Sequence, residues 1–215
     1  ATLERGGLID DPQGCLLFAS TSSGLVELQQ EERRVAAFGG LAASRRQAGA
    51  DRAAWATGLR NAAAALERGH AAGEARGAAG AEDRAHLCTA RAQAAELLRG
   101  LLEEAAEADD SGGAEAALRE ALSWAEAATR MWGEAVEHER RREQLQEPEP
   151  ETLSALAGAL LASGALTLKL APEAAAAERA AGRASIAQAF ETFEGAVALC
   201  DTAKGDDVPE LLGEW

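Results

Sequence analysis

The chain is poor in aromatic residues: among its 215 residues it has no Tyr, four Phe and four Trp. Sheet interiors are enriched in β-branched and aromatic side chains, so this scarcity disfavours a β fold. Alanine is abundant instead, and its helix propensity is the highest of all residues. The long windows rich in Ala, Leu, Glu and Arg therefore predict an all-α protein whose helices pack closely through thin interfaces.

Cysteine and histidine are also scarce. Cys15, Cys88 and Cys200 lie far apart and form no C-x-x-C pair, which argues against a disulfide framework or a cysteine zinc site and suits a reducing compartment. The three histidines fall in separate segments, so we expect solvated or half-buried side chains and no metal site. Phosphate-binding glycine motifs and catalytic triad patterns are absent from the sequence, which therefore indicates no cofactor and no enzymatic activity.

Positive charge is the minority: 21 Lys and Arg stand against 36 Asp and Glu, a formal net charge of −15. Nucleic acids and anionic membranes are bound through concentrated cationic faces, so we expect neither as a partner. No run of about 18 apolar residues is found, which predicts no transmembrane segment. The sequence starts at Ala1 without a signal-peptide core, so we expect a soluble, processed or truncated chain, in the cytoplasm or in an organelle after transit-peptide removal.

Helix-breaking stretches divide the chain into four predicted segments. These are an irregular N-terminal arm (1–23), an N-terminal helical hairpin (24–80), a long central helical hairpin (81–146), and a C-terminal hairpin with the start of a further helix (147–215). The 3.6-residue periodicity predicts helices over 24–48, 51–78, 81–108, 114–146, 151–163 and 183–203. The first hairpin is expected to turn at Ala48-Gly49-Ala50, and residues 166–172 are expected to be a linker.

Two stripes of alternating small and bulky residues mark the C-terminal segment as a helical hairpin. Their positions are Leu153, Leu156, Ala157 and Leu160 in the first helix, and Ala189, Phe193 and Ala196 in the second. Spacings of three and four residues put each set on one helix face. Gly164 follows the first stripe, where the pattern predicts a turn.

This pattern resembles the tetratricopeptide repeat family. In that family the first helix carries bulky and small residues at the spacing of Leu153, Leu156, Ala157 and Leu160, followed by a turn glycine, and the second carries Ala-x3-Phe-x2-Ala. The resemblance is divergent and covers roughly the last hundred residues. It implies antiparallel hairpins stacked as a solenoid or bundle, with a concave surface that binds peptides or other subunits.

One helix of the central segment carries a candidate partner-binding surface. Trp124 precedes Trp132 by eight residues, which places it about 80° around the helix axis. With Trp132 expected in the core, Trp124 falls at the margin of the core face. Arg140, Arg141 and Arg142 follow at the end of the same helix, so an aromatic anchor and a cationic rim share one rigid element.

The sequence therefore favours a non-enzymatic scaffold or an accessory subunit of a larger complex, in an organelle or in the cytoplasm. Its expected partners are other protein subunits or peptides. Two alternatives stay open: a helical-bundle enzyme with a dispersed site, and a coiled-coil or membrane-curving homodimer. Breaks near 49, 109–113 and 147–150 argue against one long rod. The partner, the oligomeric state and the compartment are open.

Overall fold

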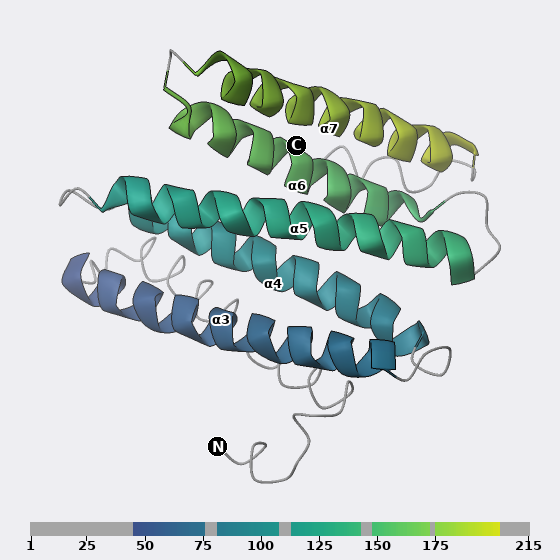
Figure 1. Ribbon diagram of the computed structural model, residues 1–215, viewed down its shortest axis with the longest axis horizontal. Helices are drawn as coiled ribbons and strands as arrows, with labels where there is room; N and C mark the ends of the chain where they lie inside the picture. The colour runs from purple at the N-terminus through teal and green to yellow at the C-terminus, as the bar shows by residue number, and fades with distance from the viewer. Residues whose placement is uncertain (1–44, 76–80, 108–112, 143–147, 173–174, 203–215) are drawn as a thin grey trace, which may run out of the picture. The chain divides into compact units, whose positions relative to one another are not determined.

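The computed structural model describes residues 45–75, 81–107, 113–142, 148–172 and 175–202 (Figure 1). Within these residues all regular structure is helical, which confirms the predicted all-α class. The helices are α3 (Arg45–Ala75), α4 (Ala81–Glu107), α5 (Ala114–Arg142), α6 (Pro150–Leu170) and α7 (Ala176–Thr202). The predicted arm, nearly all of the predicted first helix and the last 13 residues (203–215) lie outside the described residues.

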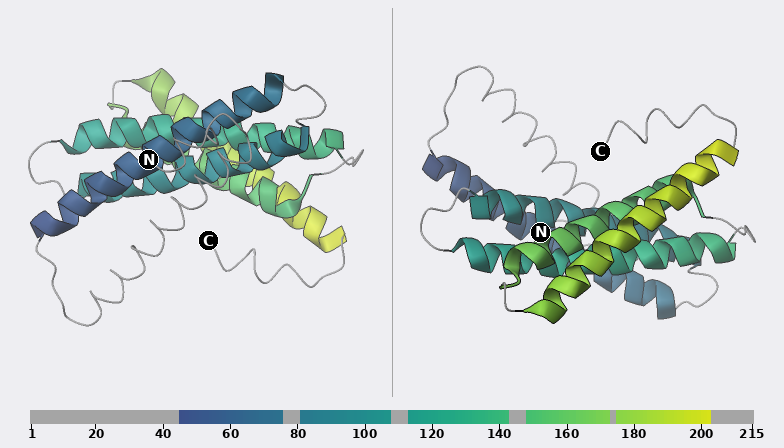
Figure 2. Two further views of the ribbon diagram at one scale, coloured as in Figure 1. Left: turned by 90° about the horizontal axis from the view of Figure 1, so that it is seen from below. Right: turned by 90° about the horizontal axis from the view of Figure 1, so that it is seen from above.

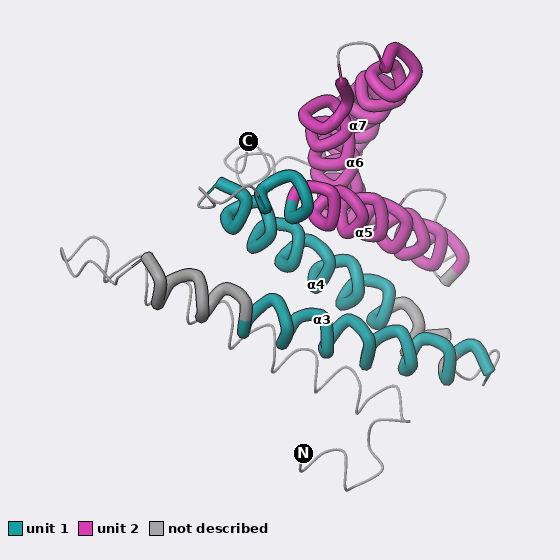
Figure 3. The backbone as a smooth tube through the Cα atoms, turned by 60° about the vertical axis from the view of Figure 1, so that its left-hand side comes forward, with its two compact units in different colours: residues 1–117 teal, residues 118–215 magenta. Residues whose placement is uncertain are grey.

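The chain divides into two compact units, Ala1–Ala117 and Leu118–Trp215 (Figure 3). The first holds α3 and α4, and the second holds α6, α7 and all but the first turn of α5. The predicted central hairpin (81–146) spans the boundary between the two units. The pairing of its two helices therefore stays a prediction.

In the first unit α3 and α4 pack against each other as an antiparallel pair (Figure 1). Their facing stripes supply the largest fully buried side chains, which are Leu59, Leu66, Leu87, Leu98, Leu101 and Cys88. These stripes are the ones that the periodicity predicts. Because each helix spans seven or more turns, a narrow stripe of leucines and alanines suffices to bury the pair.

The turn predicted at residues 48–50 is wrong, because α3 begins at Arg45 and runs through Gly49 without a break. A single glycine among alanines costs a helix only about 1 kcal/mol relative to Ala. Asp51 is therefore an interior residue of the helix.

In the second unit α6 and α7 lie side by side and antiparallel (Figures 1 and 2). The linker predicted at 166–172 is wrong: α6 continues to Leu170, and α7 begins at Ala176. Leu166 is buried, and the Thr167 hydroxyl donates to the Ser163 carbonyl at 2.8 Å. Apolar burial and this hydrogen bond both stabilise the helical conformation of the stretch. The helix ends at Ala171, which is extended and precedes a proline, as the sterics of that position favour.

The two helices approach most closely at two glycines. A Cβ on Gly164 would lie 2.7 Å from the carbonyl oxygen of Gly182 and 2.7 Å from Cγ1 of Ile186. A Cβ on Gly182 would lie 3.0 Å from the carbonyl oxygen of Gly164. Gly164 is therefore a contact residue inside α6, and its predicted place in a turn is wrong.

The crossing fixes the register of the hairpin. On α7 the residues that follow Gly182 at intervals of four and three form a seam, which consists of Gly182, Ile186, Ala189, Phe193, Ala196 and Cys200. Four of these are buried, and Ile186 and Phe193 are half-buried. A small residue recurs in this seam every seventh position, so the backbones stay close along the contact.

The start of α6 is held by a carboxylate from α5. Glu149 is the N-cap residue of α6 and makes no side-chain cap hydrogen bond. Glu139 binds this end instead: its Oε2 accepts from the backbone N–H of the N-cap residue Glu149 at 3.1 Å, and its Oε1 accepts from the Thr152 hydroxyl at 2.6 Å. A negative charge there also complements the helix dipole.

Candidate functional site

The predicted surface on α5 has a mixed character. Trp132 is buried, with 6% of its surface exposed, and Trp124 is half-buried. Ala128 and Met131 follow Trp124 by four and seven residues, on the same side of the helix, and both are buried. Trp124 therefore lies within the buried sector of α5 while keeping part of its ring in solvent. Its role as a partner anchor stays a prediction.

The arginines at the end of α5 are spread around the helix. The Arg140 guanidinium contacts Glu137 at 3.1 Å and that of Arg141 contacts the same carboxylate at 3.9 Å, and both arginines are exposed. Arg140 is sixteen residues after Trp124, which is about 160° around the axis. Position 142, the last of α5, falls in line with Trp124, about 27 Å further along. The cationic rim expected beside Trp124 therefore stays a prediction.

The positions that carry the family resemblance lie mainly on the α6–α7 contact. Ala157, Leu160 and Gly164 of α6 are buried, as are Ala189 and Ala196 of α7. The bulky members of the pattern, Leu153, Leu156 and Phe193, are half-buried. These residues therefore act in packing the hairpin.

Two polar pairs form successive rungs between α3 and α4, and the sequence analysis anticipated neither. In the first, Arg91 donates to Glu67 from Nε at 3.0 Å and from Nη2 at 2.8 and 2.9 Å. The Arg91 side chain is 9% exposed and that of Glu67 50%. Such forked geometry is the strongest form of a carboxylate–guanidinium pair. It lets the hairpin bury an arginine within an otherwise apolar contact.

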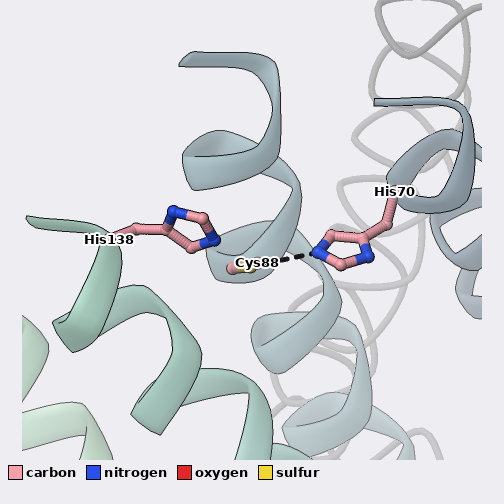
Figure 4. A group of neighbouring side chains, drawn as sticks. All are labelled: His70, Cys88 and His138. Atoms are coloured by element: carbon pink, nitrogen blue, oxygen red, sulfur yellow. Dashed lines mark hydrogen bonds between the residues drawn. The ribbon is translucent and has the colours of Figure 1, made fainter. Parts of the chain in front are cut away.

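The second rung joins His70 to Cys88, whose Sγ lies 3.6 Å from Nε2 of the imidazole (Figure 4). The thiol donates when Nε2 is unprotonated, and the ring N–H donates when it is protonated. Cys88 is fully buried and His70 is half-buried. Figure 4 also labels His138, which belongs to α5 of the other unit. Within the first unit the pair offers two ligand atoms, fewer than the three or four of a protein zinc site.

The sequence signal for these rungs is a matched spacing. His70 follows Glu67 by three residues, and Arg91 follows Cys88 by three, so each two residues share a helix face. In an antiparallel pair, the alignment of the two helices that brings Glu67 to Arg91 also brings His70 to Cys88. This spacing can be interpreted only when the pairing of α3 with α4 and its register are known. The sequence alone therefore does not predict the two polar pairs.

The outer side of α7 presents a second stripe, which consists of Arg183, Ala187, Phe190 and Glu194. All four are exposed, and among the side chains that the structure describes Phe190 is the large apolar residue exposed to solvent, at 56%. Each member follows a seam residue by one position and is therefore turned about 100° away from α6. We call this set the α7 outer stripe.

Helix α6 is, by length and composition, apolar enough to cross a membrane. It meets this criterion because Ala, Gly, Ser and Thr interrupt its leucines without adding charge, and the absence of a transmembrane segment stays a prediction. Its charged residues, Glu151 and Lys169, stand near its two ends. Core helices of soluble proteins satisfy the same criterion, and α6 packs one face against α7.

Comparison with known proteins returns no family model, no curated protein and no solved structure that matches this chain. The resemblance to tetratricopeptide repeats therefore stays a prediction, and the functional argument rests on the chain's own residues.

Proposed function

We propose that this chain is a non-enzymatic interaction protein, a scaffold or an accessory subunit that binds other protein subunits or peptides through exposed helix faces. The observation that carries the proposal is Phe190, 56% exposed on a helix whose other exposed residues are small or polar. Single exposed apolar residues are common on protein surfaces. Here, however, the ring stands beside Ala187 and between two charges, the arrangement of an aromatic anchor with a polar rim.

The chemistry of the polar pairs supports a binding role over the alternative of a helical-bundle enzyme. A catalytic cysteine is an accessible thiolate, whereas the Cys88 thiol is fully buried. The Arg91 guanidinium is occupied by Glu67. The Cys88 thiol and the Arg91 guanidinium thus contribute to packing α3 against α4. Trp124 with the three arginines of α5 is kept as a second predicted surface.

Site-specific photo-crosslinking tests the proposal. A benzophenone amino acid at position 190 should crosslink to a protein chain in cells. The same group at position 184, which is also exposed but about 120° around α7, should do so much less. Position 184 thus controls for non-specific capture by an exposed benzophenone. Equal or absent protein crosslinks at the two positions would refute the proposed binding surface.

A further inference from the structure

We infer that the α7 outer stripe binds the same stripe of a second copy of this chain, with the two α7 helices antiparallel. This inference rests on the proposed function, since it names the partner of the same surface. It is carried by the order of the four exposed residues, which reads positive, small, large and negative along Arg183, Ala187, Phe190 and Glu194.

This order is complementary to its own reversal. The midpoint between positions 183 and 194 coincides with the midpoint between positions 187 and 190. A twofold axis at that point places Arg183 of each copy opposite Glu194 of the other. The same axis places each Phe190 opposite an Ala187. A twofold interface requires such self-complementarity of one patch.

The spacing suits close packing of two helices. Positions 183 and 194 are about 16 Å apart along the axis, and Phe190 lies only about 2 Å from the midpoint. The two rings therefore meet next to the twofold axis, where offset aromatic pairs stabilise an interface. Ala187 provides the room that each incoming ring needs. The charge pairs then lie about 8 Å to either side, at the rim.

Other arrangements of the same stripe are disfavoured. A parallel pair would put arginine against arginine and glutamate against glutamate. An anionic membrane would meet the carboxylates of Glu191 and Glu194, both exposed on α7, and would be repelled. The net charge of −15 opposes association of two copies at long range. At about 0.15 M salt that repulsion is screened beyond about 8 Å, whereas the pairs at the interface are in contact.

One face of a single helix buries less than the roughly 1,200 Å² of a standard interface, so we expect a weak dimer. Sedimentation equilibrium of the full chain at concentrations from about 1 µM to about 1 mM can measure the dissociation constant of such a weak dimer. Phe190→Ala should raise the dimer Kd by about 30-fold, the usual effect of removing a central aromatic anchor.

Charge reversal provides the decisive test. Arg183→Glu and Glu194→Arg should each raise the Kd about tenfold, because two attractive pairs become two repulsive ones. The double variant, and an equimolar mixture of the two single variants, should regain the wild-type Kd. Glu191→Arg is the matched control: it makes the same charge change on the same helix but off the stripe, so the Kd should be unchanged beyond the effect of net charge.

A chain that stays monomeric at about 1 mM would overturn the inference. So would a dimer in which the mixed variants fail to recover, or one that Glu191→Arg weakens as much as Glu194→Arg. The crosslinking result distinguishes failure of the self-association from failure of the proposed function. A monomeric chain whose position 190 crosslinks to a different protein removes the self-association and leaves the proposed function standing.

Discussion

The close approach of α6 and α7 makes Gly164→Ala a sharp test of the fold. The new methyl group would lie 2.7 Å from the Gly182 oxygen and 3.1 Å from the Ile186 nitrogen, as well as 2.7 Å from a side-chain carbon of Ile186. Two of these are backbone atoms, so the clash is relieved only if the helices move apart. Such overpacking typically costs about 1–3 kcal/mol.

Gly158→Ala is the matched control, since it lies on the same helix and a Cβ there meets nothing within 4 Å. Both substitutions gain the same helix propensity, about 1 kcal/mol. Gly158→Ala should therefore stabilise the protein by about that amount. Gly164→Ala should be less stable than Gly158→Ala by about 1–3 kcal/mol, because the propensity gain cancels in the comparison.

Thermal unfolding followed by circular dichroism measures the difference. For a chain of this length 1 kcal/mol corresponds to about 2–4 °C in Tm, so the two variants should differ by about 2–12 °C. Because the chain has two compact units, amide hydrogen exchange in α6 and α7 assigns the change to their hairpin. If Gly164→Ala is as stable as Gly158→Ala, the helices do not meet at Gly164 and the register described above is wrong.

Four further substitutions test the packing of individual side chains. Glu67→Gln should lower the free energy of unfolding by about 1–3 kcal/mol, because it removes a carboxylate that pairs with the buried Arg91 guanidinium. Glu103 pairs with Arg99 one turn away in α4, and the Arg99 side chain is 27% exposed against 9% for Arg91. Glu103→Gln should therefore cost less than about 0.5 kcal/mol; equal losses in denaturant unfolding would contradict this. Trp124→Ala should cost about 1–3 kcal/mol and Phe190→Ala less than about 1 kcal/mol, since only the former side chain lies in a buried sector. A larger loss at Phe190 in the same assay would show that its ring is a packing residue.

The sequence by itself determined the helical class and the inward faces of the helices. Leu59 and Leu66 of α3, and Leu87 and Leu98 of α4, recur at helical spacing in the sequence, and all four are buried. The inward face can be predicted because the spacing of apolar residues along one helix is local information. Alanine-rich windows also favour the helix over other structures. For the candidate surface the structure adds that Trp124 is half-buried and Arg140 exposed, and its role in binding stays a prediction.

Tertiary structure alone decided what the glycines and the polar residues do. Gly49 and Gly164 predict breaks when only local propensity is weighed, yet both lie within helices. At Gly164 the reason is the backbone of α7, which leaves no room for a side chain. Similarly, Glu67 and Arg91 are 24 residues apart in the chain, and they become one buried pair only in the register of α3 against α4. A sequence pattern reports which face of a helix is apolar, but the partner helix and its register depend on contacts between distant residues.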